Sequence, residues 1–390
     1  MIAEMTRYLK KMGMLVLLYP LRIFPIKSNR LLFDDNLSHK FCDNIKPIIN
    51  CLLENYEDDF EIYLSISDMS DCEALNGKKI IPVQYHSIKY FFIAMTSKFF
   101  ISNSGGYSFL PLRKTQYVIN TWHGGGAYKR FGVDAYNVSK FYRYDIMLSA
   151  KKTSYFLSTC KRTTDIFSKA LLIPRDRFWE IGMPRNDILF HADNEFGVRI
   201  KRKLGLDGKK FVLYAPTYRR VSDDTFGESV SVDYGIDTKK VCEALNNRFG
   251  GEWIFAVRLH PAIKKRANNF GEDVLNLSEY DDMQELILAS DAMINDFSSS
   301  MWDYMLTGKP GFMFATDIEH YVSTTALYTP IDKWPFKACN TNDELIETIK
   351  NFDYEDYRRK CREHYQYMGG CESGEASRKV CELIYGKSKV

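Results

Sequence analysis

Short runs of apolar and β-branched residues alternate along the chain with longer segments whose apolar positions repeat at helical spacing. A first series of runs lies at residues 30–34, 60–64, 78–82, 99–102, 117–120 and 145–148, and a second at 211–214, 253–257, 274–277, 292–294 and 311–314. Strands that alternate with helices are typical of βαβ units, which build parallel sheets. The pattern therefore predicts an α/β fold with two parallel sheets.

The joint between the two series is expected at residues 182–185, where Gly and Pro interrupt the pattern. Residues 342–382 have apolar positions at helical spacing, including Leu345 and Ile349, which predicts consecutive helices that pack back across a cleft. A chain of 390 residues is long enough for two domains. We expect a peripheral segment at 1–28, an N-terminal domain at 29–184, a C-terminal domain at 185–368, and a helix at 369–390 that packs on the N-terminal domain.

The first 28 residues combine a short apolar run with basic flanks. Residues 12–24 carry one charge, Arg22, and lie between Lys10-Lys11 and Lys27. The run is too short to span a bilayer. Lysines attract anionic headgroups while leucine and phenylalanine insert, so the pattern predicts an amphipathic segment on an anionic membrane surface. A helix that packs on the body of the protein is the alternative.

Charge and cysteine content narrow the partners and the compartment. The chain has 53 basic and 50 acidic side chains, and this net charge of +3 gives no support for a nucleic-acid partner. The nine cysteines are scattered without a CxxC pair or a spacing typical of zinc sites. This usage fits a reduced, cytosolic setting.

A first candidate site follows the predicted strand at 117–120. His123 stands where ligands bind in open α/β sheets, beyond the carboxyl end of a strand, and its pKa suits a general base near neutral pH. Gly124 and Gly125 allow the backbone to approach an acceptor closely, and Lys129 and Arg130 are candidates to meet its anionic groups. A histidine satisfied within a tight turn is the alternative.

Two strand ends in the second series carry groups suited to phosphate. Thr217 and Arg219 follow the run at 211–214, and Arg258 and His260 follow the next run. One guanidinium group can donate two hydrogen bonds at once to phosphate oxygens, and an imidazole can donate a hydrogen bond to a leaving group. Solvated surface arginines and a turn histidine are the alternatives.

A third candidate is a hydroxyl-rich helix start. Asp296 follows the predicted strand at 292–294, and Ser298, Ser299 and Ser300 come after it; all four are candidates to bind the donor phosphates. The N–H groups of a helix start, together with hydroxyls, form a site for a diphosphate. Simple N-capping by one serine is the alternative. The absence of HExxH, GxSxG and an evident catalytic carboxylate pair argues against a hydrolase.

These motifs together resemble the CDP-glycerol glycerophosphotransferase family of teichoic acid and capsule polymer synthesis. The resemblance rests on Trp122-His123-Gly124, residues 182–187, residues 214–217 with Arg219, residues 258–261, residues 295–299 and residues 374–377. Where the family commonly continues Thr-Pro-Leu-Lys after Trp-His-Gly, this chain has Gly-Gly-Ala-Tyr-Lys.

The resemblance implies a GT-B architecture, with two Rossmann-like domains that face an interdomain cleft and the donor nucleotide held by the C-terminal domain. It implies that His123 is the catalytic base, that His260 lies near the donor phosphates, and that Ser298 and Ser299 bind phosphate. It also implies a peripheral protein at the cytoplasmic face of the cell membrane, where a lipid-linked acceptor is presented.

The resulting hypothesis is a transferase that moves glycerol phosphate from CDP-glycerol to a hydroxyl of a lipid-linked or growing surface polymer and releases CMP. A CDP-ribitol donor, a nucleotide-sugar glycosyltransferase on the same fold, and a catalytically silent scaffold are the alternatives. We expect no tightly bound metal, with loosely held Mg²⁺ as the possible companion of the diphosphate.

Overall fold

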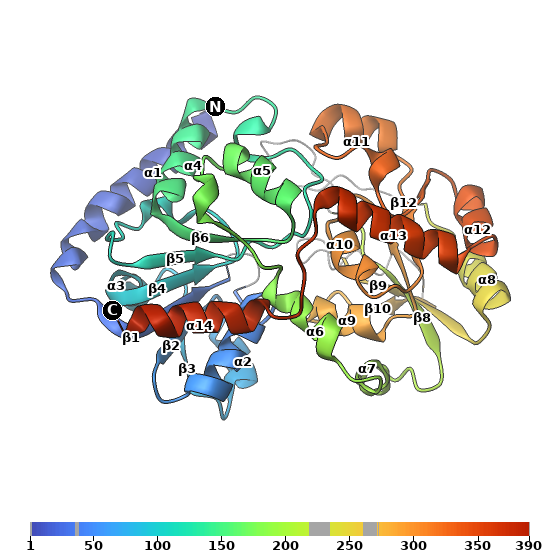
Figure 1. Ribbon diagram of the computed structural model, residues 1–390, viewed down its shortest axis with the longest axis horizontal. Helices are drawn as coiled ribbons and strands as arrows, with labels where there is room; N and C mark the ends of the chain where they lie inside the picture. The colour runs from blue at the N-terminus through green and yellow to red at the C-terminus, as the bar shows by residue number, and fades with distance from the viewer. Residues whose placement is uncertain (1, 36–38, 218–234, 260–270, 272, 390) are drawn as a thin grey trace. The chain divides into compact units, whose positions relative to one another are not determined.

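The computed structural model describes residues 2–35, 39–217, 235–259, 271 and 273–389. The chain forms two compact α/β units (Figure 1). The first unit comprises Met1–His123, Arg130–Phe190 and Gly369–Val390, and the second comprises Gly124–Lys129 and His191–Met368. The chain passes from the first unit to the second after Phe190, six residues beyond the domain boundary expected after residue 184. The short segment Gly124–Lys129, directly after His123, also belongs to the second unit.

The first unit is built on a parallel sheet with the order β3-β2-β1-β4-β5-β6-β7 among the described strands. These strands are β1 (Lys27–Asp34), β2 (Glu61–Ile66), β3 (Ile80–Gln84), β4 (Ser97–Ser102), β5 (Tyr117–Asn120), β6 (Thr153–Ser158) and β7 (Phe178–Glu180). Leu31, Leu32 and Phe33 of β1 are fully buried, as expected for a strand covered on both faces. The strand order reverses between β1 and β4, which makes their carboxyl ends a switch point where ligands bind in such sheets.

The helices of the first unit are α1 (Ile2–Leu18), α2 (Ile45–Tyr56), α3 (Ile88–Thr96), α4 (Lys140–Lys152), α5 (Lys161–Ala170), α6 (Asp187–His191) and α14 (Ala376–Ser388). Helix α2 buries Ile45, Ile48, Ile49 and Leu52, one stripe at helical spacing. The C-terminal helix α14 lies beside α2 (Figure 1), and the rings of Tyr56 and Tyr385 stack with centroids 4.4 Å apart.

One predicted strand is wrong. Residues 145–148 lie inside α4, whose N-cap Ser139 accepts a hydrogen bond from Tyr142 N. The buried residues of α4 are Ile146, Ser149 and Ala150, which share one helical face. A run of three apolar residues does not separate a strand from a buried helical turn, because both patterns contain it. The strand of this region is β6, which the sequence pattern missed.

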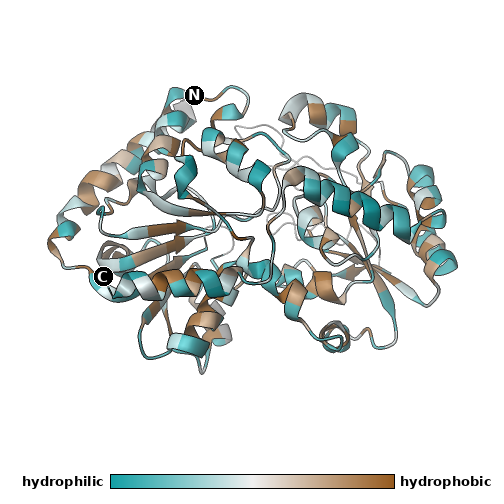
Figure 2. Ribbon diagram, viewed as in Figure 1, coloured by the Kyte–Doolittle hydropathy of each residue, from teal (hydrophilic) through white to brown (hydrophobic). Residues whose placement is uncertain are grey.

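The second unit is built on a parallel sheet with the order β10-β9-β8-β11-β12-β13 among the described strands. They are β8 (Lys210–Tyr214), β9 (Trp253–Val257), β10 (Leu275–Asn276), β11 (Ala292–Asn295), β12 (Gly311–Phe314) and the two-residue β13 (Ala338–Cys339), which the pattern missed. Its helices are α7 (Phe196–Lys203), α8 (Thr238–Phe249), α9 (Met283–Ala289), α10 (Ser300–Met305), α11 (Ile318–Thr325), α12 (Asn342–Lys350) and α13 (Tyr354–Met368). Hydrophobic residues concentrate in the strands of both sheets (Figure 2). The predicted α/β class with two parallel sheets is therefore confirmed.

Two buried carboxylates fasten the returning C-terminal segment to the first unit. Asp187 accepts hydrogen bonds from Ala376 N at 3.0 Å and Ser377 N at 2.7 Å, at the start of α14. Glu372 accepts from Met183 N and from Asn186 Nδ2, each at 3.0 Å. Each acid thus satisfies donors that a buried turn or helix start would otherwise leave unpaired.

All nine cysteines are free thiols, as the scattered spacing predicts. Within the described part of the chain, no helix has both the length and the apolar character needed to cross a bilayer.

Replacing Asp187 by alanine should destabilise the first unit, because two buried N–H groups at the start of α14 lose their acceptor. We expect a loss of about 2 kcal/mol in the free energy of unfolding, measured from urea unfolding curves. The matched control is Glu382→Ala, whose partner Arg378 is exposed, and it should change the unfolding free energy by less than about 0.5 kcal/mol. Equal unfolding curves for the two variants would contradict the assignment.

Candidate functional site

The backbone that presents His123 has an unusual conformation at the end of β5. Trp122 has a φ of +56°, a left-handed value that is rare for a bulky side chain. Its N–H donates to Asn120 Oδ1 at 2.8 Å, and its indole packs 5.2 Å from the Phe131 ring, centroid to centroid. Such a conformation costs on the order of 1 kcal/mol and persists where its surroundings hold it, which is common at functional sites.

The His123 imidazole is held as one neutral tautomer. Nδ1 lies 2.9 Å from the backbone oxygen of Asn103, and because a carbonyl only accepts, Nδ1 carries the hydrogen. Burial lowers the pKa of His123 below its ordinary value, against the opposing effects of the Asn103 carbonyl and of Asp43. The ring is therefore neutral at pH 7, and the lone pair on Nε2 can take a proton, as a general base requires.

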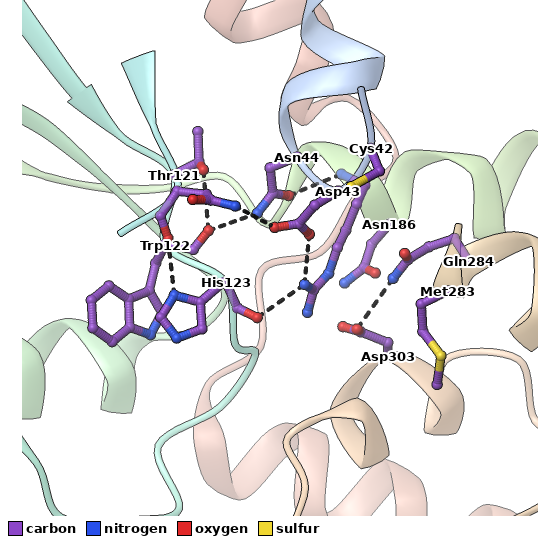
Figure 3. Close-up of polar contacts among 12 residues, drawn as sticks. Cys42, Asp43, Asn44, Thr121, Trp122, His123, Asn186, Met283, Gln284 and Asp303 are labelled. Carbon is purple, nitrogen blue, oxygen red and sulfur yellow. Dashed lines mark hydrogen bonds and ion pairs between the residues drawn. The ribbon is translucent and has the colours of Figure 1, made fainter. Parts of the chain in front are cut away.

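A polar network fixes the groups around His123 (Figure 3). Asn103 follows β4, and its side-chain amide donates to Asp35 Oδ1 at 2.6 Å and to Asp43 Oδ2 at 3.0 Å. Arg185 Nη1 donates to Asp43 Oδ1 at 2.7 Å and to the backbone oxygen of His123 at 2.9 Å. The backbone and the ring of His123 are thus both tied to the switch point of the first sheet.

The partners of His123 include residues that the sequence pattern does not mark. Asn44 donates to Trp122 O at 2.9 Å and accepts from Arg185 N at 3.1 Å, which joins the start of α2 to the network. Asp43 and Asn44 lie in a segment without periodicity, so no pattern marks them. Arg185 did carry a signal, because it stands in one of the motifs on which the family resemblance rests.

The glycine run after His123 packs within the second unit. A Cβ on Gly125 would stand 2.1 Å from Trp302 Cδ1, and Gly126 has a φ of +66°. The local packing and backbone conformation therefore explain why glycine stands at these two positions, whether or not the glycines also contact an acceptor. Lys129 Nζ lies 5.5 Å from the centroid of the Tyr321 ring, and Arg130 is exposed. Gly124 is buried.

In the second unit, Asp296 holds the turn after β8 rather than presenting its carboxylate outward. The residue is almost fully buried, and its two oxygens accept from Thr217 N at 2.8 and 2.9 Å. Thr217 Oγ1 also donates to Asp296 Oδ1 at 2.7 Å. The acid therefore joins the carboxyl ends of β8 and β11 and fixes the position of Thr217.

The three serines form a small hydroxyl cluster at the start of α10. Ser300 Oγ lies 3.0 Å from Ser298 Oγ, and Ser300 N donates to Ser298 Oγ at 3.3 Å. Ser299 occupies the N-cap position without a side-chain cap hydrogen bond, so simple capping does not account for it. All three residues are half-buried. Their hydroxyls supply hydrogen-bond donors suited to phosphate oxygens.

Arg258 is the predicted basic group of the second unit that lies within the described residues. Its Nε donates to Tyr280 O at 3.2 Å and its Nη2 to Asp281 O at 3.4 Å, so the guanidinium braces the loop before α9. Arg219 and His260 lie outside the described residues. The described candidates that follow strands β5, β8, β9 and β11 all stand at carboxyl ends, where the sequence placed them.

Two Rossmann-like units, one with a neutral histidine and one with a hydroxyl cluster at strand ends, have the architecture of the GT-B class of transferases. The family described as CDP-Glycerol:Poly(glycerophosphate) glycerophosphotransferase matches residues 17–386. The chain is 27% identical over 380 residues to a teichoic acid poly(glycerol phosphate) polymerase of Bacillus spizizenii, covering 93% of this chain and 94% of that protein. It is 26% identical over 373 residues to a teichoic acid glycerol-phosphate transferase of Staphylococcus aureus, covering 92% and 93%.

A solved structure of the wall teichoic acid polymerase TagF shares the fold, with a TM-score of 0.82 and 24% identity over 100% of this chain and 98% of that one. The chain belongs to the CDP-glycerol:poly(glycerophosphate) glycerophosphotransferase family, a family of enzymes. The GT-B architecture and the family resemblance expected from the sequence are confirmed.

The charges beside His123 should set the pH dependence of the enzyme. Activity that needs the unprotonated ring is lost as the pH falls through the His123 pKa, so the acid limb of kcat/KM should lie below pH 6.5, the ordinary pKa. Asp43 raises this pKa and Arg185 lowers it. Asp43→Asn should therefore move the limb to lower pH and Arg185→Met to higher pH, measured from pH–rate profiles. Shifts of the same sign would contradict the network.

Gly125→Ala should destabilise the second unit, because the added methyl overlaps the Trp302 indole. Overpacking of this kind costs about 1–3 kcal/mol, which thermal unfolding followed by tryptophan fluorescence measures. Gly386→Ala in α14 is the matched control, since no atom lies within 4 Å of its added Cβ and alanine is favoured in a helix by roughly 0.5–1 kcal/mol. A Gly125→Ala protein as stable as the control would refute the contact.

Proposed function

We propose that the enzyme transfers glycerol phosphate, which is a polyol phosphate, from CDP-glycerol to a hydroxyl group of a lipid-linked or growing teichoic acid polymer. The reaction releases CMP. The observation that carries the proposal is the His123 ring, whose Nδ1–H is held by Asn103 O so that Nε2 keeps its lone pair. Membership of the glycerophosphotransferase family supports this donor class.

The proposed reaction is one in-line transfer. His123 Nε2 takes the proton of the acceptor hydroxyl, and the oxygen forms a bond to the β-phosphorus, which carries the glycerol. The bond from that phosphorus to the bridging oxygen breaks, and CMP leaves with the electron pair. Phosphoryl transfer depends on positioning and charge stabilisation more than on covalent catalysis by the protein. The conformation of Trp122 and the bond to Asn103 supply that positioning.

The donor diphosphate is assigned to the second unit. The hydroxyl cluster of Ser298, Ser299 and Ser300, with Thr217 held beside it by Asp296, supplies hydrogen-bond donors for the phosphate oxygens. Arg219 and His260, the cationic groups of the same strand ends, are proposed to complete the site. Arg258 is proposed to brace the loop before α9, through its hydrogen bonds to Tyr280 O and Asp281 O.

Lys129 and Arg130 are proposed to meet phosphate groups of the acceptor polymer. Arg130 is exposed and Lys129 half-buried. No tightly bound metal is part of the proposal, and Mg²⁺ that accompanies the diphosphate stays a prediction. Among the described residues, no group of three or more His, Cys, Asp and Glu side chains is placed to hold a metal ion.

The enzyme is proposed to act at the cytoplasmic face of the cell membrane, bound through α1 and the turn after it. Leu9, Val16, Leu17 and Ile23 expose 57%, 70%, 71% and 80% of their surfaces, and Lys10 beside them is exposed. Exposed apolar side chains with neighbouring cations match the requirements for binding an anionic lipid surface. Such a surface brings the enzyme to a lipid-linked acceptor.

The transfer is tested by CMP release from CDP-glycerol, CDP-ribitol and UDP-sugars in the presence of a short glycerol-phosphate acceptor. We expect acceptor-dependent CMP release from CDP-glycerol, and a fall of about 10²–10⁴-fold in kcat for His123→Ala with donor binding retained. His320→Ala, which removes an exposed histidine of α11, is the control and should keep full turnover. Release of UDP without CMP would reject the proposed donor, and full turnover by His123→Ala would reject the base.

Membrane binding is tested by sedimentation with phosphatidylglycerol and phosphatidylcholine vesicles. The protein should bind the anionic vesicles, less at high salt, and Val16→Glu/Leu17→Glu should weaken binding by about tenfold or more. Val198→Glu changes an exposed valine of the second unit, 42% exposed, and should leave binding unchanged. Equal binding by all three proteins would rule out α1 as the membrane surface.

A further inference from the structure

The six residues after His123 are fastened to the second unit along their whole length. Thr329 Oγ1 donates to Ala127 O at 2.6 Å, and Tyr328 N donates to Tyr128 O at 2.8 Å. Lys129 pairs with Leu327 in an isolated antiparallel bridge. Gly125 lies against Trp302 so closely that no side chain fits. The residues that directly follow His123 are therefore held in place by contacts within the second unit.

A buried hydrogen bond holds the middle of this segment. The Tyr128 hydroxyl lies 2.8 Å from His364 Nε2, and His364 Nδ1 lies 2.7 Å from Lys333 O. Because Lys333 O only accepts, Nδ1 carries the hydrogen and Nε2 accepts from the tyrosine. The exposed fractions of Tyr128 and His364 are 4% and 3%. Burial lowers the pKa of His364 to about 4, so the ring is neutral at pH 7 and the bond keeps one direction.

The same cluster reaches the hydroxyl-rich start of α10. Trp302, which covers Gly125, stands two residues after Ser300 in the same helix. Its ring lies 6.2 Å from that of His364 and 5.6 Å from that of Tyr365, centroid to centroid. His123 is two residues from Gly125, and two residues span at most about 7 Å. The anchorage of residues 124–129 in the second unit therefore begins at the residue directly after the base.

We propose that Tyr128 and His364 are positioning residues for the phosphotransfer, because their bond holds residues 124–129 against α10 and so fixes the point from which His123 is presented. This inference rests on the proposed function. An apolar pair would fill the same space. A satisfied buried hydrogen bond also fixes the orientation of the Tyr128 side chain and the register of residues 124–129 against α13. Misplacement of a catalytic group by about 1 Å costs on the order of 10²-fold in rate, so small movements of this segment matter for turnover.

Tyr128→Phe removes the hydroxyl and leaves the ring, so it separates positioning from packing. We expect kcat for CMP release to fall by about 10- to 100-fold, while the KM for CDP-glycerol stays within about twofold. Thermal unfolding should shift to lower temperature, because His364 Nε2 is left buried without a donor, so kcat is compared at a temperature at which both enzymes are folded. Tyr357→Phe, which removes another buried phenol hydroxyl on α13, is the matched control and should keep the wild-type kcat. An unchanged kcat for a folded Tyr128→Phe enzyme would overturn the inference.

A double-mutant cycle identifies the partner. His364→Leu should lower kcat as much as Tyr128→Phe does, and the double variant should be no slower than either single variant, because both remove the same bond. His364→Gln keeps a side-chain oxygen that can accept from Tyr128 and should recover most of the turnover. Additive losses in the cycle, or a glutamine variant as slow as the leucine variant, would overturn the inference.

The two proposals fail in different ways. A wild-type enzyme that releases no CMP from any CDP-polyol rejects the proposed function, and the positioning role with it. A wild-type enzyme that transfers glycerol phosphate, with Tyr128→Phe equally fast, rejects the positioning role alone.

Discussion

The hydrogen bond from His123 Nδ1 to the Asn103 carbonyl is the interaction on which the proposed chemistry of this enzyme depends. It joins His123, three residues after β5, to Asn103, which directly follows β4, and it decides which ring nitrogen keeps its lone pair. The network from Asp35 through Asn103 and Asp43 to Arg185 then holds both partners in place. The parallel sheet supplies the constraint, because it brings several strand ends to one edge, where short polar side chains meet without long loops.

Much of the fold follows from the sequence pattern, because buried parallel strands are short apolar runs between helices. Leu31 to Phe33 in β1 and Phe211 to Leu213 in β8 are fully buried and were predicted as strands. The pattern failed at residues 145–148, and it missed β6, the three-residue β7 and the two-residue β13. Residues 145–148 form part of α4, and β13 has only two residues, so neither gives a distinctive signal.

The candidate site was predictable only in part, because sequence shows strand ends but not what meets there. His123, Thr217 and the serines were found, since each follows an apolar run. Asp43 and Asn103 come from distant segments, and only the sheet order brings them beside His123. Asp296 was predicted to bind phosphate, and in the structure it accepts hydrogen bonds from Thr217 and from Ser298 N. Gly125 has a tertiary reason, the approach to Trp302, which no local pattern reveals.

The state of the His123 ring tests the account most directly. Nitrogen NMR of the protein labelled with ¹⁵N-histidine reports which ring nitrogen is protonated, and His123→Gln assigns the signal. The account predicts a neutral ring at pH 7 with the hydrogen on Nδ1 and a bare Nε2. A hydrogen on Nε2, or a doubly protonated ring at pH 7, would contradict the role of His123 as the base.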